Sequence, residues 1–223
     1  MNGNKNVGGK GMKKPGAALF CAIFFLLIPM VLSGCGDLKD AKESTLTVDK
    51  KGIVTEALVE DFPLEKYNKT ELENSVKELI QSYNKQAGSE KVTLAETEFK
   101  EGIAKVFLRF QSGEDYRKFN QVDFFAGTVK DAVAAGYSFE GKFLDGEGKE
   151  VAKGAVPDQC QDTQVIILQE PLCVLVPGNI LYVSENMELL GKDQAKLPDD
   201  TQIPYENAQV ITESYGYVMY SAK

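Results

Sequence analysis

The chain has 223 residues and carries 33 acidic residues against 25 basic ones, which gives a formal net charge of −8. This excess of carboxylates would repel phosphate backbones and disfavours nucleic acid as a partner. The chain contains no histidine and no tryptophan, so the commonest general base and the usual imidazole metal ligand are both missing. We therefore expect neither a histidine-dependent enzyme nor a bound metal or other cofactor.

The first 34 residues are organised like an export signal. Four lysines and no acidic residue precede an almost wholly apolar run from Ala17 to Leu32. A basic segment, an apolar run and small residues before a cut are typical of a cleaved signal peptide. The 16-residue run is shorter than the roughly 20 residues that a transmembrane helix needs. Because residues 1–11 are rich in Asn and Gly, either Met1 or Met12 fits as the true start.

The apolar run closes on the tetrapeptide Leu32-Ser33-Gly34-Cys35. A cysteine directly after small residues at this place resembles the lipobox of bacterial lipoproteins. The resemblance implies transfer of a diacylglyceryl group to the Cys35 thiol and cleavage between Gly34 and Cys35. The mature chain would then start at Cys35, anchored to the cell membrane on its extracytoplasmic face. Two acyl chains hold a protein stably, whereas one chain binds only marginally.

Removal of residues 1–34 would leave 189 residues with a net charge near −12. That length suits one domain or two small ones. The polar segment 35–44 is expected to be a tether between the membrane and the domain. Residues 45–223 are expected to form an extracytoplasmic domain, with a possible subdivision near 137–140.

The first half of this domain combines hairpins with one long helix. Residues 45–48 and 53–60 flank a polar turn and predict a hairpin; residues 92–99 and 103–110 predict a second one. Between them, Asn68 to about Gln86 predicts a helix, because Asn68 and Glu71 form a capping-box pattern. Its apolar side chains fall at helical spacing and form one stripe: Leu72, Val76, Leu79, Ile80 and Tyr83.

Short helices are predicted at 114–119 and 128–135, on either side of a strand at 122–125. From Tyr137 onward the chain becomes a series of short apolar or alternating runs separated by turn residues. These runs predict strands at 137–144, 150–153, 164–169, 173–176, 179–184, 208–212 and 215–220. The expected fold class is therefore α+β, with an antiparallel hairpin-rich sheet packed on one long amphipathic helix and a β-rich C-terminal half.

Cys160 and Cys173 are the two cysteines of the expected domain. Outside the membrane a disulfide between them is permitted, and closing so short a loop would stabilise the fold by ~3 kcal/mol. If Glu170-Pro171 turns a hairpin, however, Cys160 must curl back to meet Cys173. The bonded and the free state therefore both remain open at this point.

Four tyrosines near the C-terminus are candidate binding residues: Tyr205, Tyr215, Tyr217 and Tyr220. Their rings could stack on a glycan or a peptide. Packing within a half-buried sheet would explain them equally well. The acidic turn at Asp145–Glu150 departs from the calcium-loop pattern, so no metal site is predicted.

No catalytic-serine or phosphate-binding motif follows Cys35. We therefore predict a non-enzymatic surface lipoprotein that binds or scaffolds an unknown protein or cell-wall partner. One alternative is a small cell-envelope hydrolase, which a cleft with converging carboxylates of raised pKa would favour. The other is a solute-binding lipoprotein of a transporter, a class that usually needs two α/β lobes.

Overall fold

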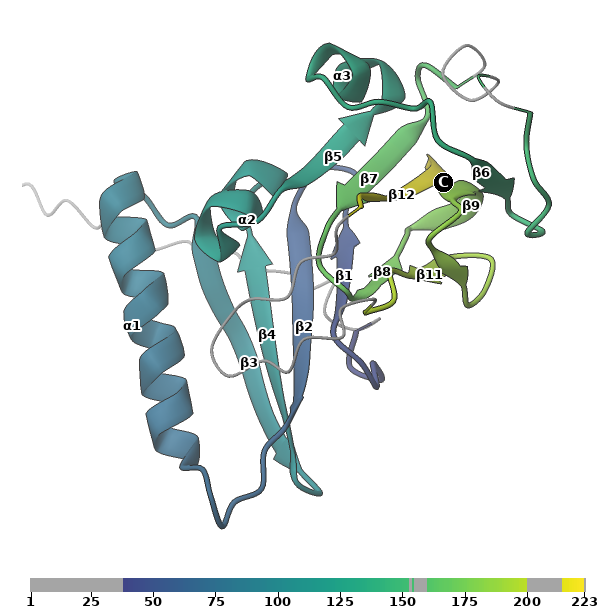
Figure 1. Ribbon diagram of the computed structural model, residues 1–223. Helices are drawn as coiled ribbons and strands as arrows, with labels where there is room; N and C mark the ends of the chain where they lie inside the picture. The colour runs from purple at the N-terminus through teal and green to yellow at the C-terminus, as the bar shows by residue number, and fades with distance from the viewer. Residues whose placement is uncertain (1–37, 153, 155–159, 200–213, 223) are drawn as a thin grey trace, which may run out of the picture. The chain divides into compact units, whose positions relative to one another are not determined.

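Two β-sheets and three helices make up the part of the chain that the computed structural model describes, which is residues 38–152, 154, 160–199 and 214–222 (Figure 1). The described residues are mostly strands with few helices, which confirms the expected mixed α+β class. All of them belong to one compact unit. No helix within these residues is long and apolar enough to cross a membrane.

The first sheet has seven strands in the order β10-β11-β8-β1-β2-β4-β3. Its neighbours pair antiparallel, except that β1 and β8 run parallel. Two hairpins supply its β1–β2 and β3–β4 pairs, as the turn residues predict. The strands are β1 (Thr45–Val48), β2 (Val54–Asp61), β3 (Val92–Lys100), β4 (Ile103–Phe110), β8 (Cys173–Leu175), β10 (Glu188–Leu189) and β11 (Gln194–Lys196).

The second sheet has five strands in the order β5-β7-β12-β9-β6, and all its pairs are antiparallel. Strand β12 lies at its centre, between β7 and β9. The strands are β5 (Phe124–Thr128), β6 (Phe143–Asp145), β7 (Gln164–Leu168), β9 (Gly178–Ser184) and β12 (Gly216–Ala222).

The long helix α1 (Lys69–Ala87) begins and ends at residues that suit a helix boundary. The side chain of Asn68 accepts hydrogen bonds from the backbone N–H groups of Thr70 and Glu71, and Gly88 adopts a left-handed conformation (φ 71°). Both devices satisfy backbone groups that the helix itself leaves unpaired. The other helices are α2 (Gly113–Asn120) and α3 (Val129–Ala134).

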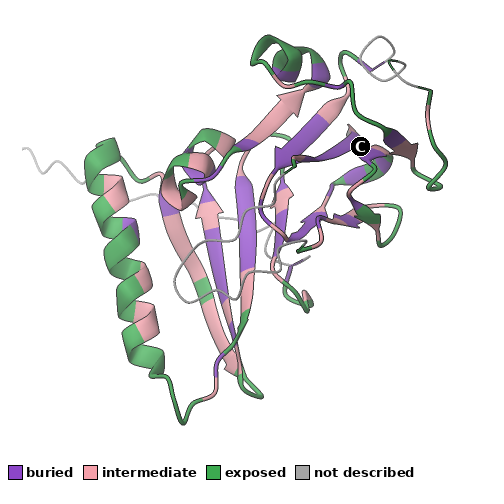
Figure 2. Ribbon diagram, viewed as in Figure 1, coloured by how far each residue is buried: buried purple, intermediate pink, exposed green. Residues whose placement is uncertain are grey.

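The two sheets share one hydrophobic core, called the main core below. Figure 2 shows the resulting line of buried residues along the middle strands of both sheets. Apolar side chains from the two sheets meet there, among them Leu46, Val54, Leu108, Ile166, Val183 and Val218. Helix α1 closes one end of this core and packs on the edge strand β3.

Only one side of α1 reaches the main core. Leu72, Val76 and Tyr83 pack against it, whereas Leu79 is 62% exposed. Leu79 was expected on the same stripe. Successive helical residues are about 100° apart, which puts Leu79 on the margin of the stripe, on the side away from Ile80. A helix that packs against an edge strand does not cover that margin.

A second cluster covers the opposite face of the five-stranded sheet. Helix α3 and the segment that follows it lie over β7 and β12. The buried sheet residues of this cluster include Val165, Ile167 and Met219. Because side chains alternate along a strand, these residues face away from the main core. The five-stranded sheet is therefore covered on both sides.

The start of the described chain is docked on the outer face of the seven-stranded sheet, the face that points away from the main core. Leu38 is fully buried there against Ala57 and Phe107. The ammonium group of Lys39 lies 3.0 Å from Oε2 of Glu96. The expected tether at 35–44 thus differs from the structure over residues 38–44, because burial of one leucine attaches the segment to the sheet.

Candidate binding cleft

The structure separates the four candidate tyrosines. Tyr215 and Tyr217 lie on the side of the five-stranded sheet that α3 covers, and both line a cleft. Tyr220 is buried in the main core on the opposite side, as expected from the alternation of side chains along a strand. Tyr205 lies outside the described residues. Two of the four candidates therefore belong to one site.

The cleft has a volume of about 610 Å³ and lies between α2, β5, the turn after α3 and the start of β12. We call it the aromatic cleft. It is lined by Glu114, Arg117, Asp123, Phe124, Phe125, Ala135, Gly136, Tyr137, Ser138, Tyr215 and Tyr217.

A row of rings forms the wall of the aromatic cleft. The ring centroids of Phe125 and Tyr137 are 5.4 Å apart, and those of Tyr137 and Tyr215 are 5.5 Å apart with their planes at 81°. Tyr215 and Tyr217 continue the row at 6.4 Å. Such distances and tilts are favourable for aromatic pairs. Each ring packs against the next, and Phe125, Tyr137 and Tyr215 are each half-buried.

The position of Tyr137 follows from the way α3 ends. Gly136 has a left-handed conformation (φ 96°), its N–H donates to the carbonyl of Val133, and the N–H of Tyr137 donates to the carbonyl of Ala132. This pattern is a Schellman motif, which turns the chain back over the last helical turn. The helix predicted at 128–135 ends directly before Gly136, in agreement with this motif. Tyr137 was predicted to begin a strand, so its place in the cleft was not anticipated.

Asp123 supplies a carboxylate to the row of rings. The Tyr215 hydroxyl donates a hydrogen bond of 2.9 Å to Oδ2 of Asp123. Partial burial, together with this bond, raises the pKa of Tyr215 to about 12. Burial and the charge of Asp123 also raise the pKa of Tyr137. Both phenols therefore stay protonated and can donate hydrogen bonds at neutral pH.

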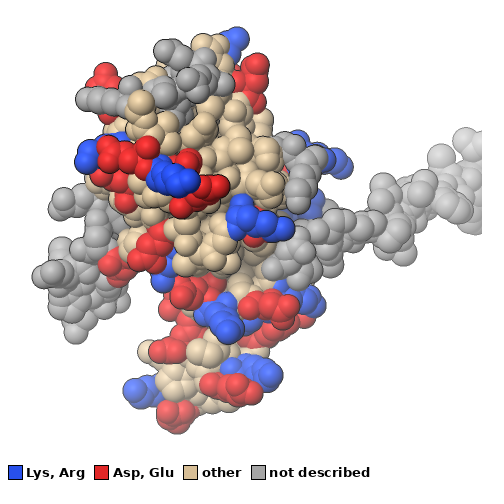
Figure 3. All heavy atoms as spheres, turned by 90° about the vertical axis from the view of Figure 1, so that its right-hand side faces the viewer, with Lys and Arg blue, Asp and Glu red and all other residues tan. Residues whose placement is uncertain are grey.

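The charged groups at the rim of the cleft neutralise one another. The guanidinium of Arg117 binds Glu114 through two nitrogens at 2.9 and 3.0 Å, and Lys118 lies 3.1 Å from the same carboxylate. The hydrogen bond from Arg117 is the main reason why the pKa of Glu114 falls to about 2. Figure 3, which views another side of the molecule, likewise shows acidic and basic side chains interspersed.

A second polar cluster, the carboxyl pair, lies inside the main core. The Tyr116 hydroxyl lies 2.7 Å from Oε2 of Glu170 and 3.1 Å from Oε1 of Glu56. All three residues are buried. A phenol has one proton and can donate it to only one of the two acids. Its contact with the other acid therefore needs a proton on that carboxyl group.

Burial dominates the electrostatics of the carboxyl pair. It raises the pKa of Glu56 to about 8, with the charge of Glu170 acting in the same direction. Hydrogen bonds from Tyr116 and Asn120 oppose this rise without cancelling it. Oε2 of Glu56 is buried and makes no hydrogen bond to the described residues. Neither acid lines the aromatic cleft.

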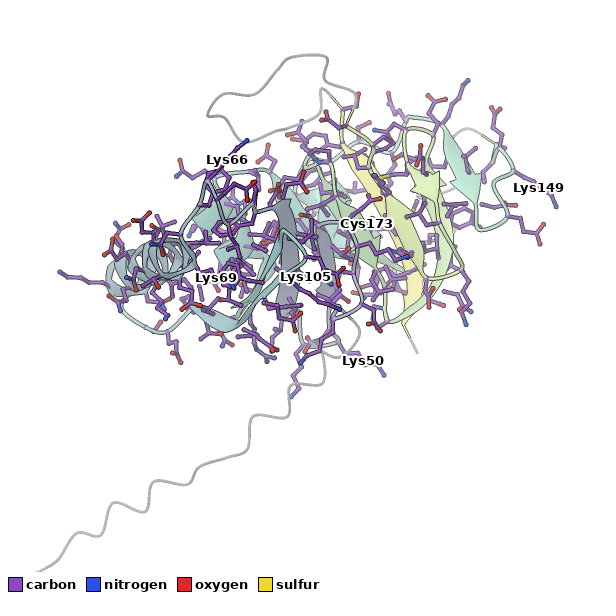
Figure 4. The ribbon with its side chains drawn as sticks, turned by 90° about the horizontal axis from the view of Figure 1, so that it is seen from below. Lys50, Lys66, Lys69, Lys105, Lys149 and Cys173 are labelled. Carbon is purple, nitrogen blue, oxygen red and sulfur yellow. The ribbon has the colours of Figure 1, made fainter. Side chains whose placement is uncertain are left out.

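The two cysteines of the domain are both buried free thiols. Cys160 belongs to the cluster under α3, whereas Cys173 is a residue of β8 in the other sheet. Figure 4 shows Cys173 among the strands. The possible disulfide between them is therefore not formed in this structure. Burial raises the pKa of the Cys173 thiol, which makes it a poor nucleophile.

The lipidation and cleavage residues, Cys35 and Gly34, lie outside the described residues. Within the described part of the chain, no group of three or more His, Cys, Asp or Glu side chains is arranged to hold a metal ion.

Comparison with protein-family models, with curated proteins and with solved structures found no match. No residue role can therefore be transferred from a relative. What the site can do follows from its own chemistry. Half-buried rings, the Tyr137 phenol and the Asp123 carboxylate suit noncovalent binding.

Proposed function

We propose that this chain is a membrane-anchored extracytoplasmic lipoprotein without enzymatic activity, and that the aromatic cleft binds its ligand. The observation that carries the proposal is the row formed by Phe125, Tyr137 and Tyr215 in a cleft of about 610 Å³. Aromatic side chains in partly desolvated clefts supply much of the free energy of noncovalent binding.

The anchoring part of the proposal is supported by the sequence. A basic segment, an apolar run and Cys35 after small residues are all present, and Cys35 would carry the two acyl chains that stable attachment needs. The partners would be the cell membrane, through the anchor, and a protein or cell-wall component, through the cleft. The acidic domain and its mixed surface charges support no nucleic-acid partner.

The fold would support the cleft. A hairpin-rich sheet that packs on one long amphipathic helix, followed by a β-rich C-terminal half, would act as a rigid frame for the cleft. Strand β5 holds Phe125, and β12 follows directly on Tyr215. Both strands pair with β7, so the two rings are positioned by adjacent pairings of one sheet.

A neutral glycan is the ligand class that the cleft favours. The charge of Glu114 is met by Arg117 and Lys118, so the rim has little net charge to offer a charged ligand. The faces of sugar rings are apolar enough to stack on Tyr and Phe. Sugar hydroxyls would find acceptors and donors in Asp123 and the Tyr137 phenol.

A small cell-envelope hydrolase is the second candidate, and the carboxyl pair is the observation in its favour. Glu56 and Glu170 converge on one hydroxyl, and the pKa of Glu56 is raised. Both acids, however, are buried in the main core and are absent from the cleft wall. A solute binder with two lobes is disfavoured because the two sheets share one core.

The test is to measure the binding of soluble fragments of cell-wall glycan to the lipidated protein in detergent by titration calorimetry. Tyr137→Ala should weaken binding by about tenfold or more, since truncation of an aromatic hot spot typically costs about 2 kcal/mol or more. Tyr67→Ala is the matched control, because Tyr67 is 54% exposed and lies outside the cleft. Equal affinity of the two variants, or glycan cleavage that Glu170→Gln abolishes, would contradict the proposal.

A further inference from the structure

The buried side chain of Leu38 limits how far the domain can move from its anchor. Leu38 is fully buried, and only three residue steps separate it from Cys35. An extended chain spans at most about 3.6 Å per residue, so three residue steps from Leu38 reach no farther than about 11 Å. A lipid on Cys35 would therefore hold the outer face of the seven-stranded sheet close to the bilayer.

The segment that carries Leu38 is attached to the sheet by polar contacts as well. Lys39 pairs with Glu96 of β3 at 3.0 Å. The ammonium group of Lys105, on β4, donates a hydrogen bond of 2.9 Å to the carbonyl oxygen of Lys39. With Leu38 packed on Phe107 between these contacts, the segment has no freedom to act as a long tether.

Two cations flank the docked segment along β4. Lys105 and Arg109 lie two residues before and after Phe107, so they share its face of the sheet at spacings of about 7 Å. Lys105 has an acidic cross-strand neighbour, Glu98. Arg109 stands opposite Thr55 and Thr93, which are both neutral.

Among the described residues, Arg109 has no acidic cross-strand neighbour on this face. It forms no salt bridge with them, and its Nε atom is buried without a hydrogen-bond partner. A guanidinium group with threonine hydroxyls on both sides suits a phosphate oxygen, because its planar set of donors matches phosphate geometry. A membrane lipid offers such a phosphate, and a lipid anchor on Cys35 would hold this face of the sheet close to it.

We propose that the outer face of the seven-stranded sheet lies against the lipid headgroups of the membrane, with Arg109 in contact with a headgroup phosphate. This inference rests on the lipidation of Cys35 proposed above. The aromatic cleft lies on the opposite side of the two-sheet stack, since its rings belong to the face of the five-stranded sheet that points away from the main core. It would therefore open away from the membrane, toward the cell wall.

The test uses the lipidated protein in vesicles of phosphatidylethanolamine and phosphatidylglycerol in equal parts, with an acceptor dye on a fraction of the headgroups. A donor dye is attached to Glu98→Cys, on the outer face beside Lys105, or to Lys149→Cys. Figure 4 shows Lys149 at the end of the molecule farthest from α1, whereas Lys105 lies near the middle. The native thiols do not interfere, because Cys160 and Cys173 are buried and Cys35 is blocked by lipid.

Energy transfer to the lipid should be severalfold stronger from position 98 than from position 149. Arg109→Gln should reduce the transfer from position 98, and circular dichroism of each variant checks that the domain is folded. Equal transfer from both positions, in protein whose mass shows a diacylglyceryl group on Cys35, would overturn this inference and leave the anchoring intact. An unlipidated mass would instead remove the proposed function on which the inference rests.

Discussion

Tyr116 and Glu56 join helix α2 to strand β2 through one contact in the main core, where Oη of Tyr116 lies 3.1 Å from Oε1 of Glu56. The same hydroxyl also meets Glu170, which follows β7 of the other sheet. Helix α2, strand β2 and the end of β7 therefore meet at this hydroxyl. Glu56 and Glu170 cannot both be ionised there without a large cost in free energy. The folded state holds a proton there that the unfolded chain would release at neutral pH.

Stability should therefore fall as pH rises through the range in which Glu56 titrates. The pKa of Glu56 is about 8 in the folded protein, against 4.5 for an ordinary glutamate. Between these values the folded state binds more protons than the unfolded state. The free energy of unfolding then decreases by about 1.4 kcal/mol per pH unit. This contribution is complete below pH 4.5 and lost above pH 8.

Glu56→Gln isolates this effect, because glutamine resembles the protonated acid in size and carries no charge. We expect the variant to show a flatter stability profile between pH 5 and pH 8, and to be at least as stable as the wild type at pH 8. Urea unfolding at several pH values measures it. Glu78→Gln, on the exposed side of α1, should leave the profile unchanged. A wild-type profile that is flat over this range would refute the shared proton.

Tyr116→Phe should destabilise the domain by about 1–3 kcal/mol, since it leaves buried carboxyl oxygens without their donor. The ring itself can stay packed on Phe110 and Phe124. Tyr220→Phe is the matched control: Tyr220 is buried in the same core, and its hydroxyl makes no hydrogen bond to the described residues. Denaturant titration of both variants should separate them. Similar losses would mean that the carboxyl pair does not depend on the phenol.

Local signals in the sequence predict individual elements better than they predict which side chains meet. Asn68 and Gly88 mark the ends of α1 because a cap acts within a few residues. In contrast, Glu56 lies in an alternating strand, where an acid is ordinarily taken to face solvent. Its burial follows from pairing with Leu46 on β1 and Leu108 on β4, and such long-range pairings leave no local trace.

The same limit explains the aromatic cleft and the docked N-terminal segment. Tyr215 could be identified as a candidate from its place in an aromatic C-terminus, but its neighbours Phe125 and Tyr137 come from elements about 80 to 90 residues away in the sequence. Leu38 is a single leucine among charged residues, a pattern typical of a tether. Its pocket is formed by β2 and β4 and is complete only in the folded sheet.

Leu38→Ala should therefore cost about 2–4 kcal/mol of stability, as expected for a fully buried leucine. A tether residue would tolerate the same change without loss. Leu79→Ala serves as the comparison, because Leu79 is 62% exposed on α1 and alanine suits a helix. Thermal unfolding of the lipidated protein and both variants measures the difference. If Leu38→Ala unfolds at the wild-type temperature, the segment is not docked.

Gly136→Ala should affect both stability and binding, because Gly136 ends α3 in a left-handed conformation and directs Tyr137 into the aromatic cleft. A side chain at this backbone conformation costs about 1 kcal/mol. If the chain relaxes to avoid that strain, the Tyr137 ring shifts away from Tyr215. We therefore expect weaker glycan binding by titration calorimetry, together with a small drop in Tm.

Gly141→Ala is the control for this change, since Gly141 has open space around its Cα atom and no left-handed conformation. It should leave both affinity and Tm close to wild type. A Gly136→Ala variant that loses stability but binds glycan normally would show that the helix end does not position Tyr137. If Gly136→Ala binds glycan more weakly and has a lower Tm, while Gly141→Ala changes neither, the Schellman motif at the end of α3 positions Tyr137 for binding in the cleft.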